Sequence, residues 1–379
     1  MNKQLKKKKI FIAMVYDIVY YPPVISLCNV LIDLNYDVIY MGECSNINVA
    51  SSLNRNGVKL YIQKYGGNGF TRFIQQYFFR RKVKKILIQE YENNSLLWLV
   101  NGQTMYLFSS FYKKYKIISY LLEYGNKINK AFRFLSPFFS YGKCLSLSYR
   151  VICCEYNRAQ ITKAVFNLTD CPFILPNKAY FNSFDDEGKI PIEIENVISN
   201  YRNKKIILYQ GIFNSERKLD YYMEAINKLP DEYVLFLMGK NSTTYSELKK
   251  TYESERIVFL PFIPPPLHMK ITELAYIGIL SYIPLANNFD QSINVLYCAP
   301  NKIYEYSKFG VPMIANDLPA LQFAFLSYRA GICVEKLRPE SIINAIIEID
   351  HNYSVYSHNS INLYNSVDLI TIISDILAN

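Results

Sequence analysis

Hydrophobic residues in the first half of the chain occur in short, nearly continuous runs that alternate with longer stretches of helical spacing. The runs predict strands at residues 9–15, 37–41, 96–101, 116–122, 150–154 and 172–175. A loop through Pro22-Pro23 and a helix to Asn35 follow the first strand, and residues 68–92 have the pattern of one basic amphipathic helix. Because buried strands alternate with helices, the pattern indicates a doubly wound parallel sheet.

A second series of the same kind begins at Lys205. Its apolar runs predict strands at 205–209, 233–238, 257–260, 275–281 and 312–315, and a helix at 218–228. We therefore expect an α/β protein with two Rossmann-like, doubly wound domains that face each other across a ligand-binding cleft. The expected divisions are an N-terminal domain at 1–181, a linker at 182–204, a C-terminal domain at 205–355, and a C-terminal helix at 356–379 that can cross back to the first domain.

The charge of the chain is divided unevenly between these halves. Residues 1–180 contain 25 Lys and Arg against 9 Asp and Glu, whereas residues 181–379 contain 17 against 23. The basic half therefore favours an anionic partner. Its basic residues alternate with aromatic ones, which favours a membrane surface over a nucleic acid, with a merely solvated basic face as the alternative. The basic residues concerned are Lys6–Lys9, Arg72, Arg80, Arg81, Lys82, Lys84 and Lys85.

Several classes of protein are disfavoured by composition. The eight cysteines include no C-x-x-C pair and there are only three histidines, so neither a zinc site nor a disulfide framework is indicated. No segment reaches about 18 uninterrupted apolar residues, the length needed to span a bilayer. With half of its 379 residues hydrophobic, the chain is long enough to form two cores.

The segment 292–317, SINVLYCAPNKIYEYSKFGVPMIAND, is the most informative part of the chain. It places Glu305 early on a short predicted helix that follows Pro300 and ends at Gly310, ahead of a buried strand. A carboxylate fixed at this point can accept hydrogen bonds from the paired hydroxyls of a ribose. The segment therefore indicates an enzyme that binds a sugar nucleotide.

A second constellation follows the predicted strand at 205–209. Gly211 lets the backbone approach a ligand closely, and the start of the next helix favours an anion. Arg217 and Lys218 can neutralise a diphosphate. The alternative is an ordinary turn between strand and helix with a solvated basic pair.

These motifs resemble those of the group 1 glycosyltransferases of the GT-B fold. The resemblance is carried by YQG with E-R-K, LFLMG, IVFLPFIP and PNKIYEYSKFGVPMIAND, which together cover about residues 205–335. The first half agrees more loosely, through SYLLEYG at 119–125, CEYNRAQI at 154–161 and CPFILPNK at 171–178, which are similar to segments of polysaccharide-building members.

The resemblance implies a nucleotide-sugar donor, a UDP- or GDP-sugar, and no cofactor. The implied donor-binding residues are Gly211, Arg217 and Lys218 at the diphosphate, Glu305 at the ribose, Phe262 and Ile263 beside the base, and Gly239 and Lys302 nearby. For Lys302, a solvated helix residue is the alternative.

One position departs from the family pattern. Many retaining members carry a carboxylate eight residues before the ribose glutamate, where this chain has Tyr297, so the stereochemical outcome stays open. An inverting reaction needs a general base, for which Glu123 and Asp17 are the candidates, each with a capping or solvated carboxylate as the alternative. No D-x-D pattern marks a metal site, so we expect metal-independent transfer.

Together these features predict a glycosyltransferase in bacterial surface polysaccharide synthesis, of the capsule or lipopolysaccharide type. We expect it to lie in the cytoplasm, peripheral to the inner face of the cell membrane, and to act on a glycan or lipid-linked oligosaccharide acceptor. An epimerase of the same fold and a nucleotide-sugar-binding protein without transfer activity are the alternatives. Glu155, Asn157 and Arg158 are interpreted as a structural network rather than acceptor contacts, and the histidines receive no role.

Overall fold

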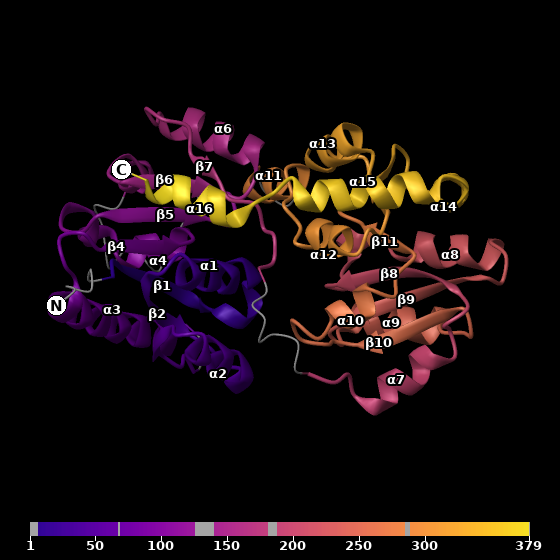
Figure 1. Cartoon of the computed structure of the whole chain (residues 1–379), viewed down its shortest axis with the longest axis horizontal. Coiled ribbons are helices and arrows are strands. Elements are labelled where there is room, and N and C mark those ends of the chain that lie inside the picture. The colour runs from indigo at the N-terminus through magenta and orange to yellow at the C-terminus, as the bar shows by residue number, and fades with distance from the viewer. Residues whose placement is uncertain (1–6, 67–68, 126–139, 181–187, 285–288, 379) are drawn as a thin grey trace, which may run out of the picture. The chain divides into compact units, whose positions relative to one another are not determined.

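The computed structural model of the chain describes residues 7–66, 69–125, 140–180, 188–284 and 289–378. It divides the chain into two compact units (Figure 1). Unit 1 consists of Met1–Asn182 together with Asp368–Asn379, and unit 2 consists of Ser183–Val367. Each unit has its own sheet and its own buried core.

Unit 1 is built on a parallel sheet whose described strands follow the order β3-β2-β1-β4-β5-β6-β7. These strands are β1 (Lys9–Asp17), β2 (Asp37–Glu43), β3 (Lys59–Ile62), β4 (Leu96–Val100), β5 (Ile117–Leu121), β6 (Arg150–Cys153) and β7 (Phe173–Ile174). The helices of the unit are η1 (Ile18–Tyr20), α1 (Pro22–Asp33), α2 (Ile47–Arg55), α3 (Phe70–Glu90), α4 (Gly102–Leu107), η2 (Ser109–Lys113), α5 (Tyr141–Ser146), α6 (Tyr156–Phe166) and α16 (Leu369–Leu377).

Unit 2 has a parallel sheet in which the described strands follow the order β10-β9-β8-β11-β12-β13. These strands are β8 (Lys205–Gly211), β9 (Tyr233–Gly239), β10 (Ile257–Pro261), β11 (Ile277–Leu280), β12 (Met313–Asn316) and β13 (Gly331–Val334). The helices are α7 (Ile192–Ser199), η4 (Ser215–Arg217), α8 (Asp220–Lys228), α9 (Thr243–Tyr252), α10 (Met269–Thr272), α11 (Phe289–Leu296), α12 (Lys302–Lys308), α13 (Pro319–Tyr328), α14 (Pro339–His351) and α15 (Tyr353–Asn365).

The two sheets share one topology. In each, the first three strands run outward in one direction, and the fourth returns to the other side of the first. The loops that follow the first and fourth strands therefore diverge, between β1 and β4 in unit 1 and between β8 and β11 in unit 2. Doubly wound sheets bind ligands at this switch point, beyond the carboxyl ends of the strands.

The predicted α/β class with two doubly wound sheets is confirmed, but two strands were not expected. β3 and β13 are four-residue edge strands; β3 has no buried residue, and in β13 only Gly331 and Val334 are buried. Both give a weak strand signal, because Lys59 interrupts the apolar run of β3 and the run at β13 is short and contains Gly331, a residue disfavoured in strands. The buried central strands were all predicted.

Two segments differ in detail from the expected division of the chain. Within the expected linker, residues 182–187 lie outside the described part, and α7 follows, with Ile194 and Ile198 buried in the core of unit 2. The C-terminal segment contains the end of α15 and then α16, which packs against α1 within unit 1 (Figure 1). The short apolar helix α16 thus completes the first unit although it is last in sequence.

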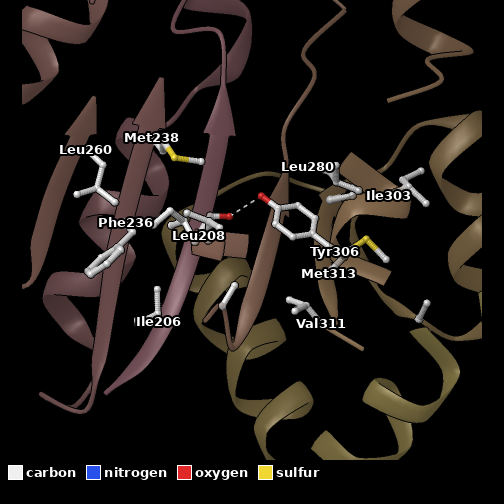
Figure 2. Close-up of a cluster of buried hydrophobic side chains, with 14 of the residues drawn as sticks. Ile206, Leu208, Phe236, Met238, Leu260, Leu280, Ile303, Tyr306, Val311 and Met313 are labelled. Atoms are coloured by element: carbon white, nitrogen blue, oxygen red, sulfur yellow. Dashed lines mark hydrogen bonds between the residues drawn. The ribbon is translucent and has the colours of Figure 1, made fainter. Parts of the chain in front are cut away.

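The position of α12 on the sheet of unit 2 is fixed by Tyr306. Its hydroxyl donates a hydrogen bond of 2.8 Å to the carbonyl of Leu208 on β8, and the ring lies in the buried cluster (Figure 2). The ring crosses β11 at Gly278, where an added Cβ would stand 2.5 Å from it. A side chain at Gly278 would therefore displace α12, which carries Glu305 as its fourth residue.

Candidate functional site

Glu305 lies at the centre of a buried polar network in unit 2. It is only 8% exposed, and each carboxylate oxygen has a partner. Oε2 accepts a hydrogen bond of 2.7 Å from Gln210 Nε2, and Oε1 lies 3.4 Å from His268 Nε2. Three elements thus meet at one carboxylate: the end of β8, the start of α10, and α12.

The network continues through Thr272, so that the Gln210 amide has a defined orientation. The Thr272 hydroxyl donates a hydrogen bond of 2.8 Å to Gln210 Oε1. Its oxygen also lies 3.2 Å from the carbonyl oxygen of His268. Gln210 therefore presents its NH₂ group to Glu305. Neither His268 nor Thr272 was predicted as a site residue. No motif marks them, since they reach Glu305 only through the fold.

The electrostatics of the network keep Glu305 ionised. Burial alone would raise the pKa of Glu305, but His268, Lys302 and the Gln210 hydrogen bond together hold it below its ordinary value. An ionised carboxylate offers about four lone pairs, and two are engaged by Gln210 and His268. Among the described residues, these contacts leave one acceptor position on each oxygen, which is the requirement for binding two neighbouring hydroxyls.

Lys302 lies one turn before Glu305 and meets the end of β8. Gly211 has a φ of +146°, and a Cβ built on it would stand 2.8 Å from Lys302 Nζ. Burial, together with the nearby Arg217 charge, outweighs the attraction of Glu305 and lowers the pKa of Lys302 to about 8. Gly211 therefore allows an ammonium group to lie directly against the backbone, where an anion can approach both.

Arg217 connects the loops that follow β8 and β11. Its Nη1 donates a hydrogen bond of 3.1 Å to the carbonyl of Ser281, and the Ser281 hydroxyl donates back to the carbonyl of Arg217. The guanidinium carbon lies 4.2 Å from the centre of the Tyr282 ring. Asn316 in turn holds the Tyr282 backbone, by hydrogen bonds of 2.8 and 2.7 Å. A second cation is thus fixed at the switch point of the sheet.

Lys218 is placed differently from Arg217. It adopts a left-handed backbone conformation, with a φ of +44°, and its Nζ lies 5.7 Å from the centre of the Tyr221 ring. Among the described contacts, none joins it to Glu305 or Lys302. The helix predicted from residue 218 begins only at Asp220, because the short turn η4 intervenes, so an acidic side chain occupies its first turn.

The remaining predicted donor-binding residues border the same sheet edge. Gly239 pairs with Gly211, and an added Cβ there would stand 2.1 Å from the Gly211 carbonyl oxygen, so close packing of β8 and β9 requires this glycine. Phe262 is 44% exposed, and Lys240 Nζ lies 5.2 Å from its ring centre. Ile263 is buried in the core. Of these, Phe262 offers a ring face to a ligand, whereas Ile263 offers only its backbone.

In unit 1, the two candidate bases lie at the carboxyl edge of the sheet in different environments. Asp17 Oδ1 accepts hydrogen bonds from the backbone N–H groups of Val19 at 3.1 Å and Ser45 at 3.2 Å, and so caps η1. Glu123 is exposed just beyond β5. Burial and then the Glu123 charge raise the pKa of both Tyr16 and Tyr21, whose ring centres are 5.5 Å apart. The charge of Glu123 therefore acts on a pair of tyrosines at the same sheet edge.

The peptide that precedes Glu123 is held by two buried side chains. Asn101 Oδ1 accepts a hydrogen bond of 2.9 Å from the Leu122 N–H, and Arg158 Nη1 donates one of 2.9 Å to the Leu122 carbonyl. Glu155 caps α6 by accepting from the Arg158 N–H and also binds Asn157. The Glu155–Asn157–Arg158 network is structural, and it fixes the turn from which Glu123 projects.

In the part of the chain that the structure describes, no group of three or more His, Cys, Asp or Glu side chains is arranged to hold a metal ion. No helix over the described ranges is long and apolar enough to cross a bilayer.

No protein-family model matches the chain, and neither does the sequence of any curated protein. Solved structures do match along nearly its whole length. HepE of Anabaena in complex with UDP aligns with a TM-score of 0.64 and 12% identity, over 97% of this chain and 98% of that chain. A glycosyltransferase from Rickettsia africae aligns with a TM-score of 0.67 and 14% identity, over 98% and 97%. A protein from Listeria monocytogenes assigned as a UDP-N-acetylglucosamine 2-epimerase aligns with a TM-score of 0.62 and 12% identity, over 99% of this chain and 96% of that chain.

At these identities the likeness establishes the fold alone: two doubly wound units, as in the GT-B glycosyltransferases.

Proposed function

We propose that the chain is a glycosyltransferase that moves a sugar from a nucleoside diphosphate to a glycan acceptor. One arrangement carries this proposal: the ionised carboxylate of Glu305, which has one described protein partner on each oxygen, lies one helical turn from Lys302, whose ammonium group lies at Gly211, the end of strand β8. This combination suits a ribose diol joined to a diphosphate. The site also lies at the switch point, where doubly wound sheets bind nucleotides.

In the proposed reaction, an acceptor hydroxyl oxygen forms a bond to the anomeric carbon of the donor sugar. The bond between that carbon and the diphosphate oxygen breaks, and its electron pair leaves with the diphosphate. Arg217 and Lys302 stabilise the charge that develops there. The hydroxyl proton passes to Glu123 in an inverting reaction, or to the departing diphosphate in a retaining one.

The donor is proposed to be a UDP-sugar, with a GDP-sugar as the second choice. HepE was crystallised with UDP and with UDP-glucose, and its fold matches over nearly the whole of both chains. In this chain, the exposed ring of Phe262 next to Lys240 offers a surface for the base. We propose that transfer is independent of a metal ion, since cationic side chains meet the diphosphate charge.

The acceptor is proposed to be lipid-linked and presented at the inner face of the bacterial cell membrane, during surface polysaccharide synthesis of the capsule or lipopolysaccharide type. Helix α3 supports this proposal. Its buried side chains include Phe79, Val83 and Ile86, and these lie on one side of the helix. The opposite side exposes the apolar or aromatic residues Phe70, Ile74, Tyr77 and Ile88 together with the basic residues Arg81, Lys84 and Lys85.

A solvent-facing helix side that combines apolar and basic residues suits an anionic membrane surface. Lys7–Lys9 precede or begin β1 in the same unit, and Lys6 lies outside the described residues. We expect the protein to sediment with vesicles that contain phosphatidylglycerol, less so at high salt, and not with neutral vesicles. Equal binding to both kinds of vesicle would contradict electrostatic docking, and retention on random oligonucleotides alone would favour the nucleic-acid alternative.

The direct test of the function begins with nucleotide binding. Thermal-shift and calorimetric titration with UDP, GDP, ADP and CMP should identify one nucleotide that raises the melting temperature. The matching radiolabelled sugar nucleotide, incubated with bacterial lipid extract and EDTA, should then transfer label into the lipid fraction. Failure of every nucleotide to bind would contradict the proposal.

An epimerase is the second candidate, because the matching Listeria protein is assigned that activity. An epimerase converts its sugar nucleotide without an acceptor, whereas a transferase requires one. Incubation of the donor alone, followed by separation of the two epimers, distinguishes the two functions. Binding without any turnover in either assay would favour a nucleotide-sugar-binding protein.

A further inference from the structure

His268 has no part in the reaction proposed above, yet it is buried against the carboxylate on which donor binding depends. It immediately precedes α10, is 8% exposed, and faces Glu305 Oε1 across 3.4 Å. We propose that His268, supported by Gln210 and Thr272, is a positioning residue that orients Glu305 for a ribose diol and thereby makes the site discriminate ribonucleotides from 2′-deoxyribonucleotides. This inference rests on the proposed function, since it concerns the same nucleotide site.

The first step concerns the rotation of the carboxylate. The terminal torsion of a glutamate is broad and has no sharp rotamers, so an unrestrained carboxylate turns freely. In this structure, Gln210 holds one oxygen at 2.7 Å and His268 lies at the other. Contacts to both oxygens, from two different elements, fix the plane of the group. Binding of a diol then requires little further ordering of the side chain.

The second step concerns which positions remain for a ligand. An ionised carboxylate can only accept, so Gln210 must turn its NH₂ group toward Glu305 and its carbonyl oxygen toward the Thr272 hydroxyl, at 2.8 Å. Among the described residues, each oxygen of Glu305 therefore has one protein partner, which leaves one acceptor position on each for a ligand. Two acceptors on adjacent oxygens match the spacing of vicinal hydroxyls, and loss of one hydroxyl leaves one of them unsatisfied.

The third step separates positioning from simple stabilisation. A histidine retained for packing alone would be expected to bond through both ring nitrogens, as buried polar atoms generally do. Within the described residues, the buried Nδ1 of His268 has no hydrogen-bond partner. Buried ion pairs are also weak sources of stability compared with apolar residues of similar size. The arrangement therefore favours a role at Glu305 over a role in the core.

Lys302 does not duplicate this role, although its charge also acts on Glu305. Its ammonium nitrogen lies close to Gly211, since a Cβ built on that glycine would stand only 2.8 Å from Lys302 Nζ. It is therefore placed toward the end of β8, where the diphosphate is proposed to bind. Orientation of the carboxylate depends on His268 and Gln210.

The test compares ribo- and deoxyribonucleotides in a matched set of variants. Calorimetry would measure the binding of UDP and 2′-deoxy-UDP, and of the corresponding GDP and ADP pairs, to the full chain and to His268→Leu, His268→Gln and His268→Asn. His358→Gln, an exposed histidine on α15, is the control. Glutamine places an amide nitrogen near the position of Nε2, whereas asparagine places it near Nδ1. Melting temperatures without ligand would show that each variant is folded.

For the unmodified chain we expect the ribonucleotide to bind about tenfold or more tightly than its 2′-deoxy form, since a hydrogen bond to a charged group is lost. In His268→Leu and His268→Asn the ratio should fall to about threefold or less, while deoxynucleotide affinity changes by less than about twofold. His268→Gln should retain most of the discrimination, and His358→Gln all of it.

Three results would overturn the inference. The first is equal binding of the ribonucleotide and the 2′-deoxynucleotide by the unmodified chain. The second is that the His268 variants bind both nucleotides more weakly by the same factor. The third is that His268→Leu keeps the full ratio of ribonucleotide to deoxynucleotide affinity. These outcomes leave the proposed function intact, because the nucleotide still binds. If no nucleotide bound the unmodified chain, the proposed function would fail and this inference with it.

Discussion

The carboxyl ends of the strands form an edge on each of the two sheets, and these two edges have the same topology but carry different side chains. In unit 2, the edge between β8 and β11 holds a buried carboxylate, Glu305, whose oxygens both have protein partners. In unit 1, the edge beyond β1 and β5 carries Glu123, which is exposed beside Tyr16 and Tyr21. Topology therefore sets the position of each candidate site, and the side chains determine how far that site is ordered in the absence of a ligand.

This difference suits two kinds of ligand. An ordered, charged pocket suits a small ligand with fixed groups, such as a nucleoside diphosphate. An exposed carboxylate beside aromatic rings suits a sugar, whose apolar faces stack on rings and whose hydroxyls bind carboxylates. The comparison predicts that changes in unit 2 affect donor binding and that changes in unit 1 affect transfer.

The largest expected effect comes from removing each of the two carboxylates in turn. Glu305→Ala should weaken nucleotide binding by about a hundredfold, since two hydrogen bonds to a charged group are lost. Glu123→Ala should leave nucleotide affinity unchanged within about twofold while slowing transfer. Calorimetry and a transfer assay measure the two effects. Loss of nucleotide binding in Glu123→Ala would break the distinction between the edges.

A smaller effect concerns pH, and it arises only in unit 2. The pKa of Lys302 is lowered to about 8, and a bound diphosphate favours the protonated form. Nucleotide affinity should therefore be highest well below pH 8, where Lys302 is protonated. It should fall about tenfold between pH 7 and pH 9. Lys302→Met should bind more weakly and lose this dependence. A pH profile that is identical in the unmodified chain and the variant would show that Lys302 is not at the diphosphate.

The smallest effect separates the two roles considered for Asp17 in unit 1. Asp17 accepts two backbone hydrogen bonds at the start of η1, so Asp17→Ala should lower the free energy of unfolding by about 1 kcal/mol. Asp17→Asn keeps the accepting oxygen but removes the base, and should retain stability and transfer. A large loss of transfer in a stable Asp17→Asn variant would instead assign the base to this residue.

The sequence predicted the fold and the position of the site better than the partners within the site. Central strands such as β4 and β9 are buried along their whole length, and so appear as continuous apolar runs. The edge strands β3 and β13 are only four residues long, with few buried residues, and were missed. Glu305 and Arg217 could be proposed from the sequence because they belong to local motifs. His268 and Thr272 were missed because their contacts with Glu305 and Gln210 span tens of residues, and a lone histidine has no local signature.

The same limit explains Lys218. In the sequence it is indistinguishable from Arg217, its neighbour, and both were predicted to contact a diphosphate. In the structure, the left-handed backbone at Lys218 directs the two side chains differently, one over Tyr221 and the other over Tyr282. Backbone conformation at a single residue is not encoded in charge or spacing. Lys302, which was given an equal chance of being a solvated residue, is the cation that lies against Gly211.

A crystal structure of the chain with bound UDP, or with whichever nucleoside diphosphate binds most tightly, tests the central claim most directly. The account predicts that both ribose hydroxyls lie about 3 Å from the oxygens of Glu305 and that the diphosphate lies beside Lys302 and Arg217. A nucleotide bound with its ribose away from Glu305, and its phosphates away from both cations, would contradict it.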